Sequence, residues 1–271
     1  MKYNRLISGI IFGIFFLMHP IVGAAQQVVY GSNPMAGNYY KVRGISFYVE
    51  QYGSGVPLIL LHGNGGSISS FSGIIPALSE KYHVYAIDSR AHGKSTDASD
   101  SLSFDMMADD INALMDELKL KSACLLGWSD GGIVALTMAF RHPERVRKLA
   151  ATGANVWPDS TALIPSFWRE EQRYFDSVHL IPRKTTMEKN AWKLFLLDWY
   201  YPKFTLQQLQ SIQTPSLIIS GDHDLIRLEH TVLIYQQLPS GRLWVLPRSS
   251  HGTLIEYPDE FASKVSAFFA E

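Results

Sequence analysis

The 271-residue chain contains a single cysteine, Cys124. One cysteine excludes an intrachain disulfide and a zinc site built from several thiolates. Because Cys124 stands within the apolar run at residues 123–126, we expect it to be a small core residue rather than a reactive thiol. Stability must then come from the packed core, which a domain of this length can supply.

The chain also lacks an excess of charge of either sign. It has 24 Lys and Arg against 25 Asp and Glu, for a formal net charge of -1. This balance gives no electrostatic reason to expect nucleic acid or an anionic membrane as a partner. We therefore expect a small-molecule ligand without high charge, and the composition, 46% hydrophobic, is that of a globular protein.

No hydrophobic run is long enough to cross a bilayer, which takes about 20 residues. The longest run, residues 6–18, follows Lys2 and Arg5 and precedes small residues at 22–25. This pattern predicts a signal peptide over residues 1–25, cleaved after Ala24 or Ala25, and export to the periplasm or the medium. An uncleaved membrane anchor is the alternative; after cleavage we expect no stable membrane insertion.

Short, continuously apolar runs recur along the mature chain, at residues 58–61, 84–87, 123–126, 217–219 and 243–246. Such runs are typical of strands covered on both faces, as in a parallel sheet. Segments with helical periodicity lie between them, one capped by Ser103 and one over residues 131–142. The alternation predicts an α/β fold with a doubly wound, mostly parallel sheet in a domain spanning residues 26–271.

The alternation stops between residues 156 and 214, where we expect a helical cap inserted after the sixth strand. Thr185 and Glu188 have the spacing of a capping box at the start of one of its helices. The segment is rich in aromatic residues, which either line a pocket or pack the cap onto the core. These residues are Trp157, Phe167, Trp168, Tyr174, Phe175, Trp192, Phe195, Trp199 and Tyr200.

The sequence Gly-Trp-Ser-Asp-Gly at residues 127–131 follows a predicted strand and opens a predicted helix. A serine in such a strand–turn–helix arrangement projects from a tight turn, and flanking glycines avoid clashes there. We therefore expect Ser129 to be a nucleophile. Its base is expected to be His251, which follows the last predicted strand, and Asp222 or Asp224, after the preceding strand, would orient the histidine.

A glycine-rich segment, His-Gly-Asn-Gly-Gly at residues 62–66, directly follows the first predicted strand. Acyl transfer needs backbone N–H groups to stabilise a tetrahedral oxyanion. We expect one N–H from Asp130, the residue after the nucleophile, and the second from this segment. A phosphate-binding loop is the competing interpretation, but neither G-x-G-x-x-G nor a Walker lysine is present.

Together these motifs make the chain resemble the α/β-hydrolase superfamily over about residues 40–270. The resemblance rests on residues 62–66, 88–95, 127–131, 221–224 and 250–252, which occur in the order of that family. It implies a triad of Ser129, Asp224 and His251, with Asn64 as the second oxyanion donor. It implies a serine esterase that needs no metal or organic cofactor. Alternatives are a carbon–carbon bond hydrolase, lactonase, aminopeptidase or amidase, perhydrolase or, more remotely, a non-catalytic binding protein.

The Asp130 side chain is unexpected beside a nucleophile that must generate a negative oxyanion. It either turns away to bond nearby backbone or an arginine, or pairs with a cationic group of the substrate. Residues 127–132 are similar to valacyclovir-hydrolase-like esterases and related peptidases, which favours an amino group on the substrate.

Overall fold

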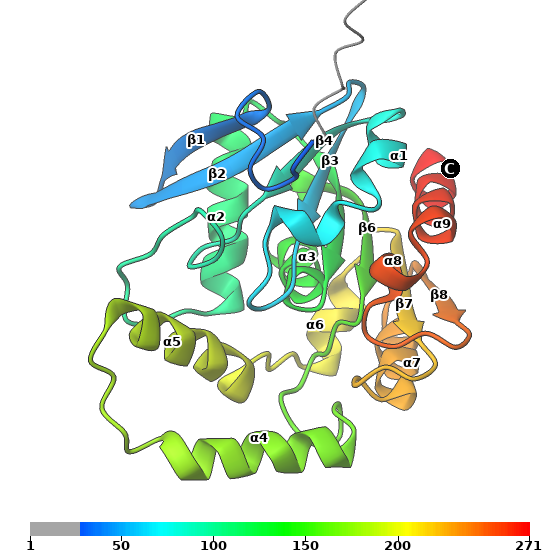
Figure 1. Ribbon diagram of the computed structural model, residues 1–271. Helices are drawn as coiled ribbons and strands as arrows, with labels where there is room; N and C mark the ends of the chain where they lie inside the picture. The colour runs from blue at the N-terminus through cyan, green and yellow to red at the C-terminus, as the bar shows by residue number, and fades with distance from the viewer. Residues whose placement is uncertain (1–27) are drawn as a thin grey trace, which may run out of the picture.

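The computed structural model describes residues 28–271, so the predicted leader and its cleavage site lie outside the described residues. An eight-stranded sheet in the order β1-β2-β4-β3-β5-β6-β7-β8 forms the centre (Figure 1). The strands are β1 Gly37–Val42, β2 Ile45–Tyr52, β3 Val56–Leu61, β4 Tyr82–Ile87, β5 Ala123–Trp128, β6 Val146–Thr152, β7 Ser216–Gly221 and β8 Gly241–Leu246. Strand β2 pairs antiparallel with β1 and β4, and every pairing from β4 to β8 is parallel.

Helices cover both faces of this sheet. The helices are α1 Ile75–Ser79, α2 Phe104–Glu117, α3 Asp130–Arg141, α4 Pro165–Val178, α5 Thr186–Tyr200, α6 Leu206–Ser211, α7 Leu228–Gln237, α8 Thr253–Glu256 and α9 Pro258–Ala270, with short 3-10 turns at Ile68–Phe71 and Pro143–Arg145. Alternate residues of β3 join different clusters: Ile59 and Leu61 pack with α2 and α3, whereas Leu58 and Leu60 pack with α1 and α9. The predicted doubly wound α/β fold is thereby confirmed.

Most predicted elements are present. The five apolar runs lie in β3, β4, β5, β7 and β8. The Ser103 hydroxyl caps α2 by accepting a hydrogen bond from the Met106 N–H at 3.2 Å. Cys124 is 2% exposed in the middle of β5, as expected of a core residue. The sequence did not reveal β1, β2 or β6. Strand β1 is an exposed edge strand with few apolar residues, and polar residues interrupt the apolar pattern of β2 and β6.

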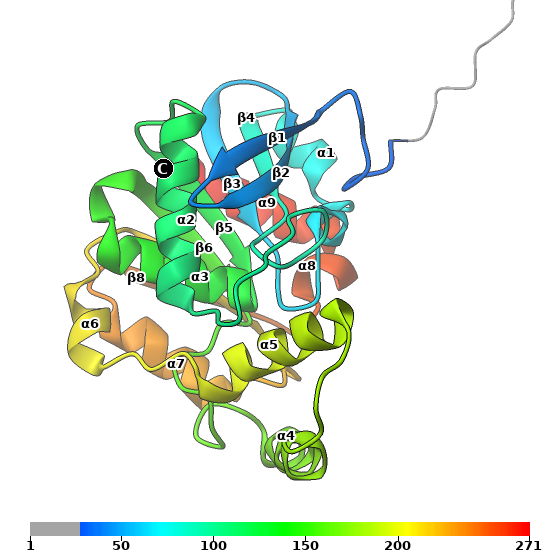
Figure 2. The same cartoon turned by 90° about the vertical axis from the view of Figure 1, so that its left-hand side faces the viewer.

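Between β6 and β7 the chain forms α4, α5 and α6, and the first two lie beyond the sheet (Figures 1 and 2). The capping box of Thr185 and Glu188 is present at the start of α5. Aromatic rings stack between α4 and α5. The ring centroid of Trp199 lies 5.1 Å from that of Trp168 and 4.5 Å from that of Phe175. These aromatic residues pack the cap helices against each other, and Tyr174 and Trp192 also line a pocket of about 250 Å³ where α4 and α5 meet.

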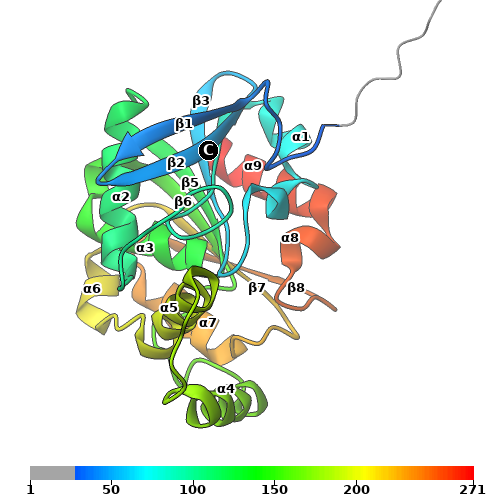
Figure 3. The same cartoon turned by 60° about the vertical axis from the view of Figure 1, so that its left-hand side comes forward.

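Helix α4 has no buried residue, and α5 lies between it and the rest of the domain (Figure 3). Leu197 of α5 joins the core cluster that contains α2 and α3. The two cap helices therefore differ: α5 is seated on the domain, whereas α4 packs on α5. None of the described helices combines the length and apolar character needed to cross a membrane.

Candidate active site

Ser129 occupies a sharp turn between β5 and α3. Its backbone has φ 55° and ψ -121°, a conformation that costs a non-glycine residue about 1–3 kcal/mol. A Cβ on Gly127 or Gly131 would overlap neighbouring backbone atoms, so only glycine fits on either side of this turn. The main-chain N–H of Ser129 donates to the Thr152 carbonyl at 2.8 Å, which ties the turn to the end of β6.

Three predicted residues meet beyond the carboxyl ends of the parallel strands β5, β7 and β8. His251 Nε2 lies 3.0 Å from Ser129 Oγ, and His251 Nδ1 lies 2.7 Å from Asp224 Oδ1. Since a carboxylate only accepts, Nδ1 carries the proton and Nε2 is left to accept from the serine hydroxyl. Asp224 Oδ1 also accepts from the Ile226 N–H at 3.0 Å, which fixes the carboxylate.

Of the two candidate acids, only Asp224 contacts the imidazole. Asp222 Oδ1 instead accepts a hydrogen bond from the Ser249 N–H at 3.1 Å. Hydrogen bonds from the main chain of Arg248 and Ser249 hold the pKa of Asp222 below its usual value. Asp222 therefore stabilises the segment that leads to His251 rather than the histidine ring.

The segment carrying His251 is held by two further side chains that the sequence analysis did not identify. Trp128 Nε1 donates to the His251 carbonyl at 2.8 Å. Glu256, at the end of α8, accepts from the Ser249 hydroxyl at 2.8 Å and from the Ser250 N–H at 2.9 Å. The main chain of His251 is thus tied both to β5, which precedes Ser129, and to α8.

The glycine-rich segment after β3 lies against Ser129. A Cβ on Gly63 would come within 2.9 Å of the Ser129 Cβ, so this backbone approaches the serine closely. Burial lowers the pKa of His62 to about 4, which keeps its ring neutral. In that state Nδ1 donates to the Gly63 carbonyl at 2.8 Å, and Nε2 accepts from the Ser89 N–H at 3.0 Å. His62 thereby fixes the backbone next to Asn64.

Asp130 is 4% exposed, and its Oδ2 receives no hydrogen bond from a donor group of the described residues. The side chains beside its carboxyl group are those of Asp198 of α5 and Asn64. The structure therefore shows neither the arginine nor the main-chain partner that the first interpretation of Asp130 expected. Burial raises the pKa of Asp130, and the neighbouring Asp130 carboxyl raises that of Asp198, which is solvent-exposed.

Asp198 is a site residue that the sequence did not reveal. The capping box located α5, but the face that the helix turns toward the nucleophile depends on packing across a long insertion. In the sequence, Asp198 cannot be told from an ordinary surface residue of the helix, because charged residues usually mark a solvated face.

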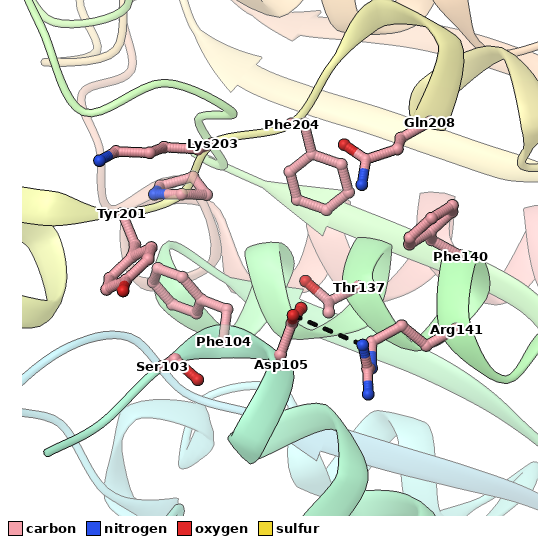
Figure 4. A pocket seen from close by; sticks show the side chains of 11 residues that line it. Ser103, Phe104, Asp105, Thr137, Phe140, Arg141, Tyr201, Lys203, Phe204 and Gln208 are labelled. Carbon is pink, nitrogen blue, oxygen red and sulfur yellow. Dashed lines mark ion pairs between the residues drawn. The ribbon is translucent and has the colours of Figure 1, made fainter.

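A separate pocket of about 320 Å³ lies near the start of α2, the end of α3 and the segment that follows α5 (Figure 4). Phe104, Phe140 and Phe204 contribute to its walls, and Arg141 pairs with Asp105 at 3.4 Å. None of Ser129, Asp224 or His251 lines it. Over residues 28–271 no group of three or more His, Cys, Asp or Glu side chains is arranged to hold a metal ion.

Comparison with known proteins gives matches along most of the chain. The model of a family described as alpha/beta hydrolase fold matches residues 56–195. Pimeloyl-[acyl-carrier protein] methyl ester esterase from Aeromonas hydrophila is 28% identical, with 83% of this chain and 99% of the relative aligned. 2-Hydroxymuconate semialdehyde hydrolase from Pseudomonas sp. strain CF600 is 26% identical, with 89% of this chain and 96% of the relative aligned. The serine hydrolase BPHL from Homo sapiens is 27% identical, with 81% of this chain and 81% of the relative aligned.

Proposed function

The chain belongs to the α/β-hydrolase fold family and is a hydrolytic enzyme, and from this we propose that it cleaves carboxylic esters of small, largely apolar substrates. The observation that carries the proposal is the continuous hydrogen-bonded series from Asp224 through His251 to Ser129, with distances of 2.7 and 3.0 Å. A serine hydroxyl becomes a useful nucleophile when a neighbouring base accepts its proton, and this series supplies that base.

In the proposed reaction Ser129 Oγ attacks the ester carbonyl while its proton passes to His251 Nε2. Asp224 holds the Nδ1 tautomer and stabilises the imidazolium. The protonated histidine then gives the proton to the departing alkoxide, leaving an acyl-enzyme. His251 next removes a proton from water, the resulting hydroxide attacks the acyl carbonyl, and the serine is released with its proton restored.

The oxyanion formed in both steps needs preorganised N–H donors. We assign these donors to the main-chain amides of Asn64 and Asp130. The assignment is supported by the close approach of the Gly63 backbone to Ser129, and by the position of Asp130 as the first residue of α3. A helix N-terminus directs unpaired N–H groups and a positive dipole end toward an anion.

A matched substrate panel tests the proposed class of reaction. Purified residues 26–271 would be supplied with short acyl esters, lactones, anilides and vinylogous diketones of similar size, and kcat/KM compared. Ester turnover with an acyl-enzyme burst supports the proposal. Preference for a carbon–carbon bond, lactone or amide substrate would transfer the chain to one of those hydrolase classes, and no turnover of any substrate would favour a non-catalytic binding protein.

A second candidate substrate class is aminoacyl esters, and the buried Asp130 favours it. A carboxylate that is 4% exposed and has no cationic partner among the described residues could be neutralised by an ammonium group. We expect Asp130→Ala to lower kcat/KM for aminoacyl esters by ~10-fold or more relative to neutral esters of the same size. Asp176→Ala, an exposed position on α4, is the control. Equal losses on both ester types would rule out a role in binding the amine.

We also propose export, on the basis of the charged, apolar and small-residue pattern at residues 1–25. The expected mature protein begins at Ala25 or Gln26. Fractionation of expressing cells followed by N-terminal sequencing and intact mass measurement tests this expectation. Protein recovered from the envelope with Met1 intact would refute cleavage and indicate an anchor.

A further inference from the structure

Asp198 contacts the side chains of both residues to which we assign the oxyanion donors. Its Oδ2 accepts a hydrogen bond from Asn64 Nδ2 at 2.9 Å. The same Asn64 amide donates to the Leu194 carbonyl, one turn earlier in α5, at 3.0 Å. The Asp198 carboxyl group also lies beside that of Asp130. A single cap residue therefore joins two elements, the loop after β3 and the start of α3.

Helix α5 is held firmly enough to serve as the support for such a bridge. Lys193 is buried, and its Nζ donates to Asp97 and to the Ser99 carbonyl, both at 2.9 Å. Asn190 Nδ2 donates to the Ala91 carbonyl at 2.9 Å. These contacts, with buried Leu197, fix α5 on the domain over the turns that precede Asp198.

We propose that Asp198 is a positioning residue that bridges Asn64 and Asp130, so that the seating of the cap helix α5 sets the geometry of the oxyanion hole. The proposal rests on the proposed function, because the oxyanion hole matters only if acyl transfer occurs. Asp198 itself need not touch the reacting atoms. It acts through the positions of the two residues whose N–H groups meet the oxyanion, and small displacements of such groups have large effects on rate.

The bridge between two carboxyl groups requires one shared proton. Two charged or titratable groups face the pair. Glu171 of α4 raises the pKa of Asp198, whereas His251 lowers the pKa of Asp130. The pKa of each carboxyl is raised, so the proton is retained at low pH and lost as pH rises through these raised values. Two ionised carboxylates would repel each other, and the bridge would open on the alkaline side.

Two substitutions distinguish the contacts that Asp198 makes from the titrating proton that it shares with Asp130. Asp198→Asn keeps an oxygen that accepts from Asn64 and supplies a permanent N–H donor to Asp130. Asp198→Ala removes both contacts. Asp176→Ala, at an exposed position on α4, controls for removal of an acidic cap residue. Thermal unfolding of each variant verifies that the domain still folds.

We expect Asp198→Ala to lower kcat on a neutral ester by about 10- to 100-fold with KM changed less than about twofold. Inhibition by an arylboronic acid, which forms a tetrahedral adduct on serine, should weaken by a similar factor. Asp198→Asn should retain kcat within about threefold and lose the alkaline decline of the wild-type enzyme.

Three results would overturn the proposal: unchanged kcat and boronate affinity in Asp198→Ala, an equal loss in Asp198→Asn, or a loss confined to KM. A wild-type chain without ester turnover would instead refute the proposed function. The two failures are therefore distinguishable, because the first is read from variants of an active enzyme and the second from the wild-type protein.

Discussion

Replacing Ser129 with alanine is expected to lower kcat for ester hydrolysis by about 10³-fold or more. The change removes the only atom that Ser129 contributes to the reaction, the Oγ that lies 3.0 Å from His251 Nε2. The strained turn should persist, because its geometry depends on the flanking glycines and on the hydrogen bond from the Ser129 N–H to Thr152.

Steady-state kinetics of Ser129→Ala, with circular dichroism and thermal unfolding as controls for the fold, would measure this effect. Ser72→Ala, at an exposed serine beside the 3-10 turn, is the matched control and should retain full activity. A folded Ser129→Ala enzyme with near wild-type turnover would mean that another group is the nucleophile.

The second large effect is expected from Asp224→Asn, which should lower kcat on the order of 10³- to 10⁴-fold. An amide cannot stabilise the imidazolium, and its NH₂ group can donate to Nδ1 and place the histidine proton on Nε2. His251 would then be unable to accept the proton of Ser129. Asp222→Asn should cost less than about tenfold, because the amide oxygen can still accept from the Ser249 N–H.

The pair of variants is informative because both replace an aspartate in the same short loop with its isostere. Measurement of kcat for each, at matched unfolding midpoints, tests the assignment. If Asp222→Asn proved the more damaging change, the role of triad acid would pass to Asp222.

Much of the site could be predicted because parallel strands end at one edge of the sheet. Ser129, Asp224 and His251 follow β5, β7 and β8, and this topology brings residues more than 100 positions apart into contact. The strands were recognisable because burial on both faces leaves them continuously apolar. The burial of Cys124 and the N-cap role of Ser103 in α2 follow from equally local signals. These signals are an apolar run and a serine before an amphipathic segment.

What the sequence could not provide depends on how distant elements pack. The first of the two interpretations of Asp130, a main-chain or arginine partner, was wrong, because the structure places another carboxyl group beside it. That arrangement depends on the rotation of α5 about its axis, which Asn190 and Lys193 fix through contacts with residues 99 and 96 positions away. Similarly, Trp128 was noted only as part of a motif, although its indole holds the main chain of His251.

Covalent labelling of the wild-type protein with a fluorophosphonate tests the central claim most directly. The account predicts one phosphonyl group per chain, located by peptide mass mapping on Ser129, with activity lost in proportion to labelling. The Ser129→Ala protein should not react. An ester-cleaving enzyme that resists the reagent, or that carries the label at another residue, would contradict the claim that Ser129 is the activated nucleophile.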